Sequence, residues 1–206
     1  MQKGQLTRTA IIEQAFRSAT QVGFEQLSLA TLAADTSMSK SGLYAHFKSK
    51  EALQEAVLEH AMERFGEIVI NPAMRQRRGA PRLLALFDGY LAWLGGTGVE
   101  GRCIFMALSQ EYANRPGVIR DKVVQAFKDW HSTIVRVIGD AVDEGVLRAD
   151  TDAHQFAFEM EGIGMSFQSS FKLMGRASAE TMARRAFARL VNDLKENRAE
   201  PLVATR

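Results

Sequence analysis

The sequence predicts an all-α fold, and three observations support that prediction. Apolar residues recur three and four positions apart along most of the chain, which is the period of an amphipathic helix. No segment shows a convincing two-residue alternation of the kind that favours a strand. With 206 residues, a hydrophobic fraction of 46% and only four prolines, the chain can bury a substantial core with few breaks in its helices.

The N-terminal part of the chain contains three short helical patterns. The first is expected over residues 9–22, the second over roughly 29–35 and the third over about 40–46. Ser28 and Ser39 stand at the N-cap positions of the second and third helices, where a hydroxyl can accept a hydrogen bond from an unpaired backbone N–H. A tight turn therefore joins these two helices.

The helix over residues 40–46 has one apolar and one polar face. Leu43 and Phe47 are four residues apart and can both face inward. The outer face is small, polar and basic, and it carries Lys40, Ser41, Tyr44 and Ala45. A helix-turn-helix places the start of its second helix against base edges, while flanking donors grip phosphates. A plain helical hairpin with a solvated face has the same periodicity, so spacing alone leaves both interpretations open.

Charge is distributed unevenly along the chain. The first 50 residues hold six lysines and arginines against three acidic residues, whereas the whole chain has a formal net charge of only +2. This asymmetry favours a polyanionic partner for the N-terminal end, but a surplus of three charges favours it only modestly.

Residues 9–53, in which AFRSATQVGFEQLSLATLA leads into SKSGLYAHFKSKEAL, resemble the N-terminal DNA-binding domain of the TetR (tetracycline-repressor-like) family of bacterial transcriptional regulators. Leu43-Tyr44, His46-Phe47 and Lys50-Glu51 followed by Leu53 recur at that family's spacing. The resemblance implies a helix-turn-helix DNA-binding domain over residues 1–50. It also implies a helical effector-binding and dimerisation domain over residues 51–206.

The resemblance further implies which residues meet DNA. It places Ser28 and Thr31 beside the DNA backbone, Ser39, Lys40, Ser41 and Gly42 in the major groove, and Tyr44, His46 and Lys50 on phosphates. Two positions depart from the family pattern. Ser37 stands in the turn where the family often has glycine, and Ala45 is small where many relatives carry a larger polar side chain. Ala45 can touch a thymine methyl group but cannot donate a hydrogen bond.

The rest of the chain also has a helical period. Helices are expected over residues 49–70, 81–94, 103–112, 117–144, 152–173 and 178–197, and Asn71-Pro72 is expected to end the first of them. By the resemblance, the last two helices of each subunit pack into a four-helix dimer interface. The predicted interface residues are Phe156, Met160, Ile163, Phe167, Phe187, Leu190, Val191 and Leu194. Gly162 and Gly164 within one of these helices indicate a close backbone approach or a pocket wall.

The resemblance places an effector pocket among aromatic and sulfur-bearing side chains. The candidates are Met62, Phe65, Phe87, Trp93, Phe105, Met106, Phe127, Trp130, Phe158 and Met165, although most residues of this kind belong to plain core. They favour a small, largely apolar effector of unknown identity. Glu159 and Glu161 fall within an apolar stretch, where solvent exposure and a ligand or interface role are both open.

Other classes of function find little support. The chain has no nucleophile elbow, Walker loop, dinucleotide fingerprint or HExxH motif, so neither an enzymatic activity nor a cofactor is expected. His46, His60, His131 and His154 show no i, i+4 pairing with one another or with Cys103, and no metal site is predicted. Cys103 could be a thiol sensor at a helix start or a small buried hydrophobe.

These observations predict a cytoplasmic homodimer that represses transcription from a palindromic double-stranded DNA operator until an effector releases it. A regulator without an effector, controlled by a protein partner, is the alternative. Glu13 and Arg17 lie within the first 23 residues, which argues against a secretory signal. No apolar run approaches the roughly 18 residues needed to span a bilayer, so no contact with a membrane is expected.

Overall fold

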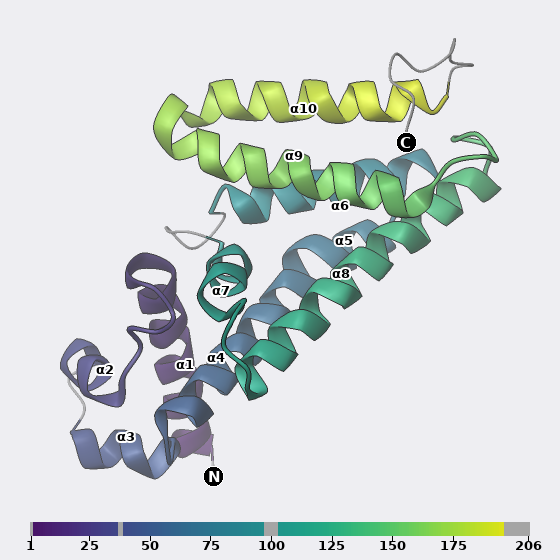
Figure 1. The fold of residues 1–206 in the computed structure, drawn as a ribbon. Coiled ribbons are helices and arrows are strands. Elements are labelled where there is room, and N and C mark those ends of the chain that lie inside the picture. The colour runs from purple at the N-terminus through teal and green to yellow at the C-terminus, as the bar shows by residue number, and fades with distance from the viewer. Residues whose placement is uncertain (1, 37–38, 97–102, 196–206) are drawn as a thin grey trace. The chain divides into compact units, whose positions relative to one another are not determined.

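The computed structural model describes residues 2–36, 39–96 and 103–195, and every regular element within these ranges is helical (Figure 1). The predicted all-α fold is therefore confirmed. The elements are α1 (Gln2–Val22), α2 (Leu29–Thr36), α3 (Lys40–His46), α4 (Lys50–Phe65), the π-helical turn η1 (Gly66–Ile70), α5 (Asn71–Met74), α6 (Ala80–Leu94), α7 (Ile104–Tyr112), α8 (Val118–Asp143), α9 (Ala153–Met174) and α10 (Arg176–Asp193). Among the helices in these ranges, none combines the length and apolar character needed to cross a membrane.

Serine side chains start the helices of the N-terminal part, as predicted. The Ser28 hydroxyl accepts a hydrogen bond from the backbone N–H of Thr31 at 3.1 Å, ahead of α2. The Ser39 hydroxyl accepts one from the backbone N–H of Gly42, also at 3.1 Å, and so caps α3. These bonds pair donors that the first turn of a helix otherwise leaves unsatisfied.

The chain departs from the predicted helix boundaries at Asn71-Pro72. α4 passes through η1 into α5, so the helical path continues to Met74. Pro72 lies in the first turn of α5, where its missing N–H breaks no intrahelical hydrogen bond. The predicted end at residue 70 thus coincides with the end of η1, but the chain starts the short helix α5 at Asn71 instead of leaving the helical path. α1 also begins earlier than predicted, at Gln2.

Two compact units make up the chain, and each combines two stretches of sequence. Unit 1 comprises Met1–Ile68 and Ala92–Lys128, and unit 2 comprises Val69–Leu91 and Asp129–Arg206. α6 and α8 each contribute residues to both units. The predicted division after residue 50 concerns function rather than packing, and it stays a prediction.

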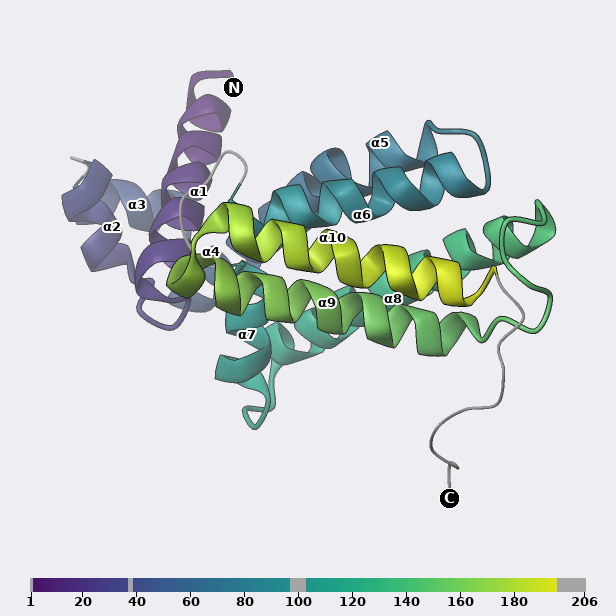
Figure 2. The ribbon, with the colours of Figure 1, turned by 90° about the horizontal axis from the view of Figure 1, so that it is seen from above.

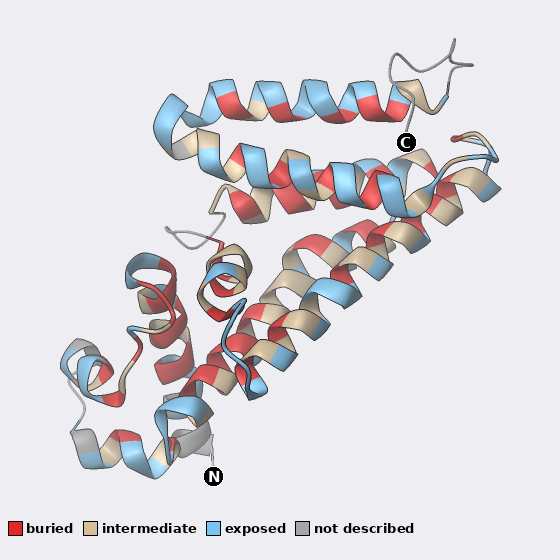
Figure 3. Cartoon of the chain, in the orientation of Figure 1, coloured by how far each residue is buried: buried red, intermediate tan, exposed pale blue. Residues whose placement is uncertain are grey.

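Unit 1 is built on one apolar core. α1 packs along α4, and α2 packs against α1 and α3. Phe16, Leu43, Phe47 and Leu58 are buried in this core, and Leu108 from α7 belongs to the same cluster. Figure 3 shows the buried stretches of α1 and α4 in red. The core of the N-terminal helices is thus completed by a helix that lies some fifty residues further along the sequence.

An ion-pair network also fastens α1 to α4. The carboxylate of Glu13 lies 2.8 Å from Nε2 of His60 and accepts hydrogen bonds from Arg64 at 3.0 and 3.1 Å. Arg17 donates to the same carboxylate at 3.1 Å. Burial by itself would raise the pKa of Glu13, but hydrogen bonds from His60 and Arg17, together with Arg64, hold this pKa below its ordinary value.

In unit 2, α9 and α10 form an antiparallel pair (Figure 2). Gly175 alone separates them, with a φ of 86° that favours glycine. The ring of Phe187 on α10 stacks on Phe87 of α6, with centroids 3.8 Å apart and planes inclined by 4°. Phe156 of α9 meets Phe187 edge-on at 6.1 Å. One aromatic cluster therefore joins α6, α9 and α10.

Candidate nucleic-acid interface and effector residues

α3 exposes mainly hydroxyl-bearing side chains and buries its large aliphatic one. Leu43 and Phe47 are buried, as their spacing predicted. On the other side, Ser39, Ser41, Tyr44 and Ala45 are exposed, while Gly42 and His46 are half-buried. Lys40 begins α3, but its side chain lies outside the described residues, as do Ser37 and Met38. The described part of this face carries hydroxyl groups that can donate hydrogen bonds to DNA.

The hydroxyls of Ser28 and Thr31 hold each other in place beside α2. Their oxygen atoms lie 3.0 Å apart, and the Thr31 hydroxyl also donates to the backbone carbonyl of Ser28 at 3.0 Å. Fixed hydroxyls lose little conformational entropy when they bind a phosphate oxygen. Their contact with the DNA backbone stays a prediction.

Lys50, which was predicted to hold a phosphate, is already engaged within unit 1. Its ammonium group donates to the backbone carbonyl of Glu25 at 2.7 Å and to the Glu25 carboxylate at 3.1 Å. An ammonium group has three N–H donors, so these two bonds orient Lys50 without using all of its donors.

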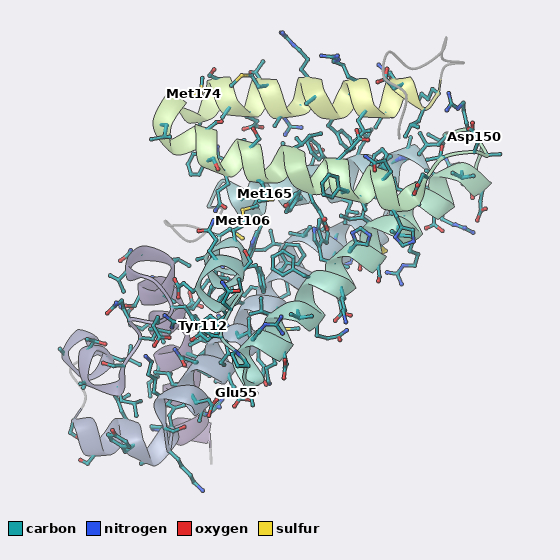
Figure 4. All side chains as sticks on the ribbon, in the orientation of Figure 1. Glu55, Met106, Tyr112, Asp150, Met165 and Met174 are labelled. Carbon is teal, nitrogen blue, oxygen red and sulfur yellow. The ribbon has the colours of Figure 1, made fainter. Side chains whose placement is uncertain are left out.

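α7 contacts the same region of unit 1. The Tyr112 hydroxyl donates to the Glu25 carboxylate at 2.9 Å, and the buried Gln54 side chain donates to the Tyr112 hydroxyl at 3.3 Å. Figure 4 shows Tyr112 on α7. Burial and the neighbouring charge of Glu25 raise the pKa of Tyr112 well above its ordinary value, so the hydroxyl keeps its proton. Sequence inspection missed this group because its members are far apart in the chain.

Three of the predicted effector residues form an aromatic cluster in unit 1. Phe65 packs edge-on against Trp93 at 5.3 Å and against Phe105 at 5.7 Å. These rings are half-buried, as are the candidates Met62 and Met106, and Met62 packs against the same core cluster as Trp93 and Phe105. They are the predicted effector residues that the fold brings together most clearly.

The remaining predicted effector residues do not join that cluster. In unit 2, Phe87 is a core residue stacked on Phe187, and Trp130 is buried 5.0 Å from the ring of Tyr90. Phe127, Phe158 and Met165 lie on the surface of the protomer. Phe158 and Met165 are exposed in the protomer, so their place in an effector pocket stays a prediction.

The predicted interface residues occupy the opposite side of the same helices. Phe156, Met160, Phe167, Phe187, Leu190 and Val191 are buried within the protomer, and Ile163 and Leu194 are half-buried. The Phe87–Phe187 stack illustrates the reason, since these side chains pack against other helices of unit 2. The buried members of this set therefore belong to the protomer core, and the part of the set in a dimer interface stays a prediction.

An apolar stripe remains exposed along α9. Phe158, Met165 and Leu173 are 69%, 57% and 87% exposed. Gly162 and Ser169, which are small and exposed, lie between them at helical spacing. Met174 at the end of α9, labelled in Figure 4, and Met182 on α10 are exposed as well. By their spacing Phe158, Met165 and Leu173 share one side of α9, and a contiguous exposed apolar patch is typical of an interaction site.

The two glycines of α9 differ in what surrounds them. A Cβ atom placed on Gly164 would lie 2.6 Å from the Tyr90 hydroxyl oxygen, so this position requires glycine. A Cβ atom on Gly162 would meet nothing within 4 Å. The predicted close approach is confirmed for Gly164, whereas the protomer gives no such reason for Gly162.

Two histidines that are distant in sequence meet in unit 2. Nε2 of His131 lies 3.1 Å from Nδ1 of His154, and Nδ1 of His131 lies 3.5 Å from the Glu161 carboxylate. Burial raises the pKa of Glu161, and the charge and hydrogen bond of His131 oppose this shift only in part. Within the described ranges, no group of three or more candidate ligands could hold a metal ion.

Cys103 is buried at the start of α7. Its sulfur accepts a hydrogen bond from the indole N–H of Trp93 at 3.4 Å. Burial raises the pKa of the thiol, which disfavours the reactive thiolate. The environment of Cys103 therefore favours a packing role over a thiol sensor.

Two family models match most of the chain. The model for "Tetracyclin repressor-like, C-terminal domain" matches residues 79–187. The model for "Bacterial regulatory proteins, tetR family" matches residues 11–57. No curated protein sequence matches the chain.

Solved structures of similar fold extend over nearly the whole chain. A TetR transcriptional regulator from Chloroflexus aurantiacus J-10-FL is 22% identical with a TM-score of 0.82, over 93% of this chain and 96% of that one. AibR in complex with isovaleryl coenzyme A and operator DNA is 26% identical with a TM-score of 0.71, over 91% and 97%. A transcriptional regulator from Saccharomonospora viridis in complex with choline is 21% identical with a TM-score of 0.73, over 94% and 100%.

Proposed function

Because the chain belongs to the TetR family of DNA-binding transcriptional regulators, we propose that it is a homodimeric repressor that leaves a palindromic operator when a small effector binds. The exposed face of α3 carries this proposal. Its small polar side chains project from a helix that is capped by Ser39 and anchored in the core by Leu43 and Phe47. Such a helix can enter a major groove without rearrangement.

The exposed stripe of α9 supports the homodimer. A twofold axis would pair Phe158 and Met165 of one copy with the same residues of another, which removes apolar surface from water on both. The small residues Gly162 and Ser169 would let the two helices approach closely. We expect the two α3 helices of the proposed dimer to bind half-sites about 34–36 Å apart or at a related spacing.

The half-buried aromatic cluster of unit 1 supports a small, largely apolar effector. Phe65, Trp93 and Phe105 offer ring faces and edges but no charge, and Met62 and Met106 can adapt to ligands of different shape. AibR, which was solved with both an acyl coenzyme A and operator DNA, gives a precedent for a regulator that binds both kinds of ligand. The effector would favour a conformer whose α3 helices no longer match successive major grooves.

Selection of bound fragments from random DNA tests the operator. The expected outcome is an inverted repeat whose two halves bind one dimer. Recovery of no preferred sequence would contradict the proposal. Release of the selected duplex is then measured with a panel of metabolites that includes acyl thioesters. If no compound that binds the protein weakens its hold on the operator, control by a protein partner replaces control by an effector.

A further inference from the structure

We infer that Tyr112 is a positioning residue for DNA binding, because through Glu25 it orients the ammonium group of Lys50 towards a DNA phosphate. The inference rests on the proposed operator-binding function. It adds a route by which α7, a helix outside the helix-turn-helix, controls one phosphate contact.

The first step is the orientation of Lys50. Its two hydrogen bonds to Glu25, at 2.7 Å to the carbonyl and 3.1 Å to the carboxylate, fix the direction of the third N–H. The side chain is 42% exposed, so that N–H is accessible from solvent. A lysine held in this way loses less side-chain entropy on binding a phosphate than a freely rotating one.

The second step is the attachment of Glu25 to α7. The carboxylate oxygen that does not face Lys50 accepts a hydrogen bond from the Tyr112 hydroxyl at 2.9 Å and lies 3.4 Å from the Arg115 guanidinium. The backbone N–H of Glu25 donates to the carboxylate of Glu111 at 3.0 Å. α7 and the residues just after it therefore hold both the side chain and the backbone of Glu25. The hydrogen bond from Lys50, supported by Tyr112 against the effect of burial, keeps the pKa of Glu25 below its ordinary value.

The third step is the rigidity of Tyr112 itself. Its ring is buried and meets Phe24 edge-on at 6.0 Å. Gln54 of α4 donates to the Tyr112 hydroxyl and, at 3.2 Å, to the backbone carbonyl of Phe24. A buried hydroxyl with fixed partners on both sides has a single orientation, in contrast to an exposed one.

The opposite end of α7 lies in the aromatic cluster. Phe105 packs against Phe65 there, and Cys103, the N-cap residue of α7, accepts the hydrogen bond from Trp93. Phe105 and Tyr112 are two helical turns apart, a separation of about 10 Å along the axis. A change of packing in the cluster that shifts α7 would therefore move Tyr112, and with it Glu25 and Lys50.

The test measures operator affinity of the full-length chain across a series of salt concentrations, using a duplex selected from random DNA. Lys50→Met is expected to lower affinity and to reduce the slope of log K against log salt by about one. Tyr112→Phe keeps the buried ring but removes the hydroxyl. It is expected to lower affinity by roughly three- to tenfold, and to have no further effect when Lys50→Met is already present.

Tyr44→Phe is the matched control, because it removes a tyrosine hydroxyl on α3 that has no contact with Glu25 in the structure. The fold-loss of operator affinity in the double variant Tyr44→Phe/Lys50→Met should equal the product of the losses in the two single variants. If Tyr112→Phe weakens binding equally with and without Lys50→Met, Tyr112 acts through the fold and the inference is overturned. If Lys50→Met leaves the salt slope unchanged while Tyr44→Phe weakens binding, the inference also fails but the proposed function stands. If the wild-type chain selects no DNA, the proposed function itself fails.

A second readout uses the fluorescence of Trp93 in a Trp130→Phe background. Operator binding is expected to change the emission of Trp93, because the same helix links it to Lys50. Tyr112→Phe should remove most of that change at saturating operator. An unaltered change of emission in this variant would overturn the proposed route through α7.

Discussion

The exposed faces of α3 and α9 differ in kind, although both helices bury an apolar side. On α3 the outward residues are Ser41, Ala45 and Tyr44, whose ring carries a hydroxyl, so only one orientation buries Leu43 and Phe47. On α9, Phe156 is buried and Phe158 is exposed, so large apolar side chains lie on both sides of the helix. Hydrophobic period therefore determines the orientation of a helix only where the other side is polar.

The largest expected effect comes from the two phenylalanines of α9. Phe156→Ala should lower the free energy of unfolding by about 3–5 kcal/mol, because it empties a buried site against Phe187. Phe158→Ala should cost the isolated protomer less than about 1 kcal/mol, because its side chain is exposed there. It should instead raise the dissociation constant of the dimer. Urea denaturation measures the free energy of unfolding, and sedimentation at several protein concentrations measures the dissociation constant of the dimer. Equal losses of stability for both variants would show that the two faces do not differ.

The two glycines of α9 give a second matched pair. Gly164→Ala should lower the free energy of unfolding by about 1–3 kcal/mol, because its methyl group collides with Tyr90. Gly162→Ala has open space in the protomer and should raise helix stability by up to about 1 kcal/mol. Thermal unfolding of both variants tests the contrast at a protein concentration low enough for the proposed dimer to dissociate. Adding Tyr90→Leu should restore part of the stability lost in Gly164→Ala and should not raise that of Gly162→Ala. A stable Gly164→Ala variant would contradict the packing of α9 on α6.

A smaller effect is expected at the ion pairs of unit 1. The folded-state pKa of Glu13 lies below its unfolded value, so the stability that it contributes is present above the unfolded pKa of about 4.3 and is lost as pH falls through the folded value. Glu13→Gln should cost roughly 1 kcal/mol at pH 7, since the carboxylate is partly screened by solvent. The free energy of unfolding of the Glu13→Gln variant should also change less between pH 5 and pH 3 than that of the wild type. Parallel acid titrations monitored by circular dichroism measure both effects.

The smallest effect is expected at Glu161 in unit 2, and its sign is opposite. Its folded-state pKa is raised, so its contribution is present below the unfolded pKa and is lost as pH rises through the folded value. Glu161→Gln should therefore leave stability at pH 7 unchanged or raise it by up to about 0.5 kcal/mol. The exposed Glu159→Gln serves as the control and should have no effect. A clear loss of stability in Glu161→Gln would mean that its pairing with His131 outweighs burial.

The sequence was most informative where a signal was local. The caps Ser28 and Ser39 and the inward side of α3 depend on residues within four positions of one another, and the structure confirms them. Pro72 indicates a point where the chain leaves the helical path, because proline disrupts a helix interior. The first turn of the new helix α5 accommodates it instead.

The sequence was least informative where partners are distant. His131 and His154 lie on different helices, so no spacing rule could pair them. The contact between Tyr112 and Glu25 spans 87 positions and depends on how α7 packs. On α9, large apolar residues lie on two sides of the helix, and the sequence pattern did not determine which side is buried in the protomer. In each case the deciding contact was tertiary rather than local.

Unit 1 cannot complete its core from the first stretch of chain alone. During synthesis residues 1–68 are made before residues 92–128, so the ring contact between Phe24 and Tyr112 cannot form until the second stretch has been made. The α9–α10 hairpin has the reverse character, because a one-residue connection makes its contacts local and its closure fast. The ribosome therefore makes α3 before it makes the residues that complete the core around the N-terminal helices. The N-terminal helices are synthesised first, but we expect them to reach their final packing only after α7 has been made.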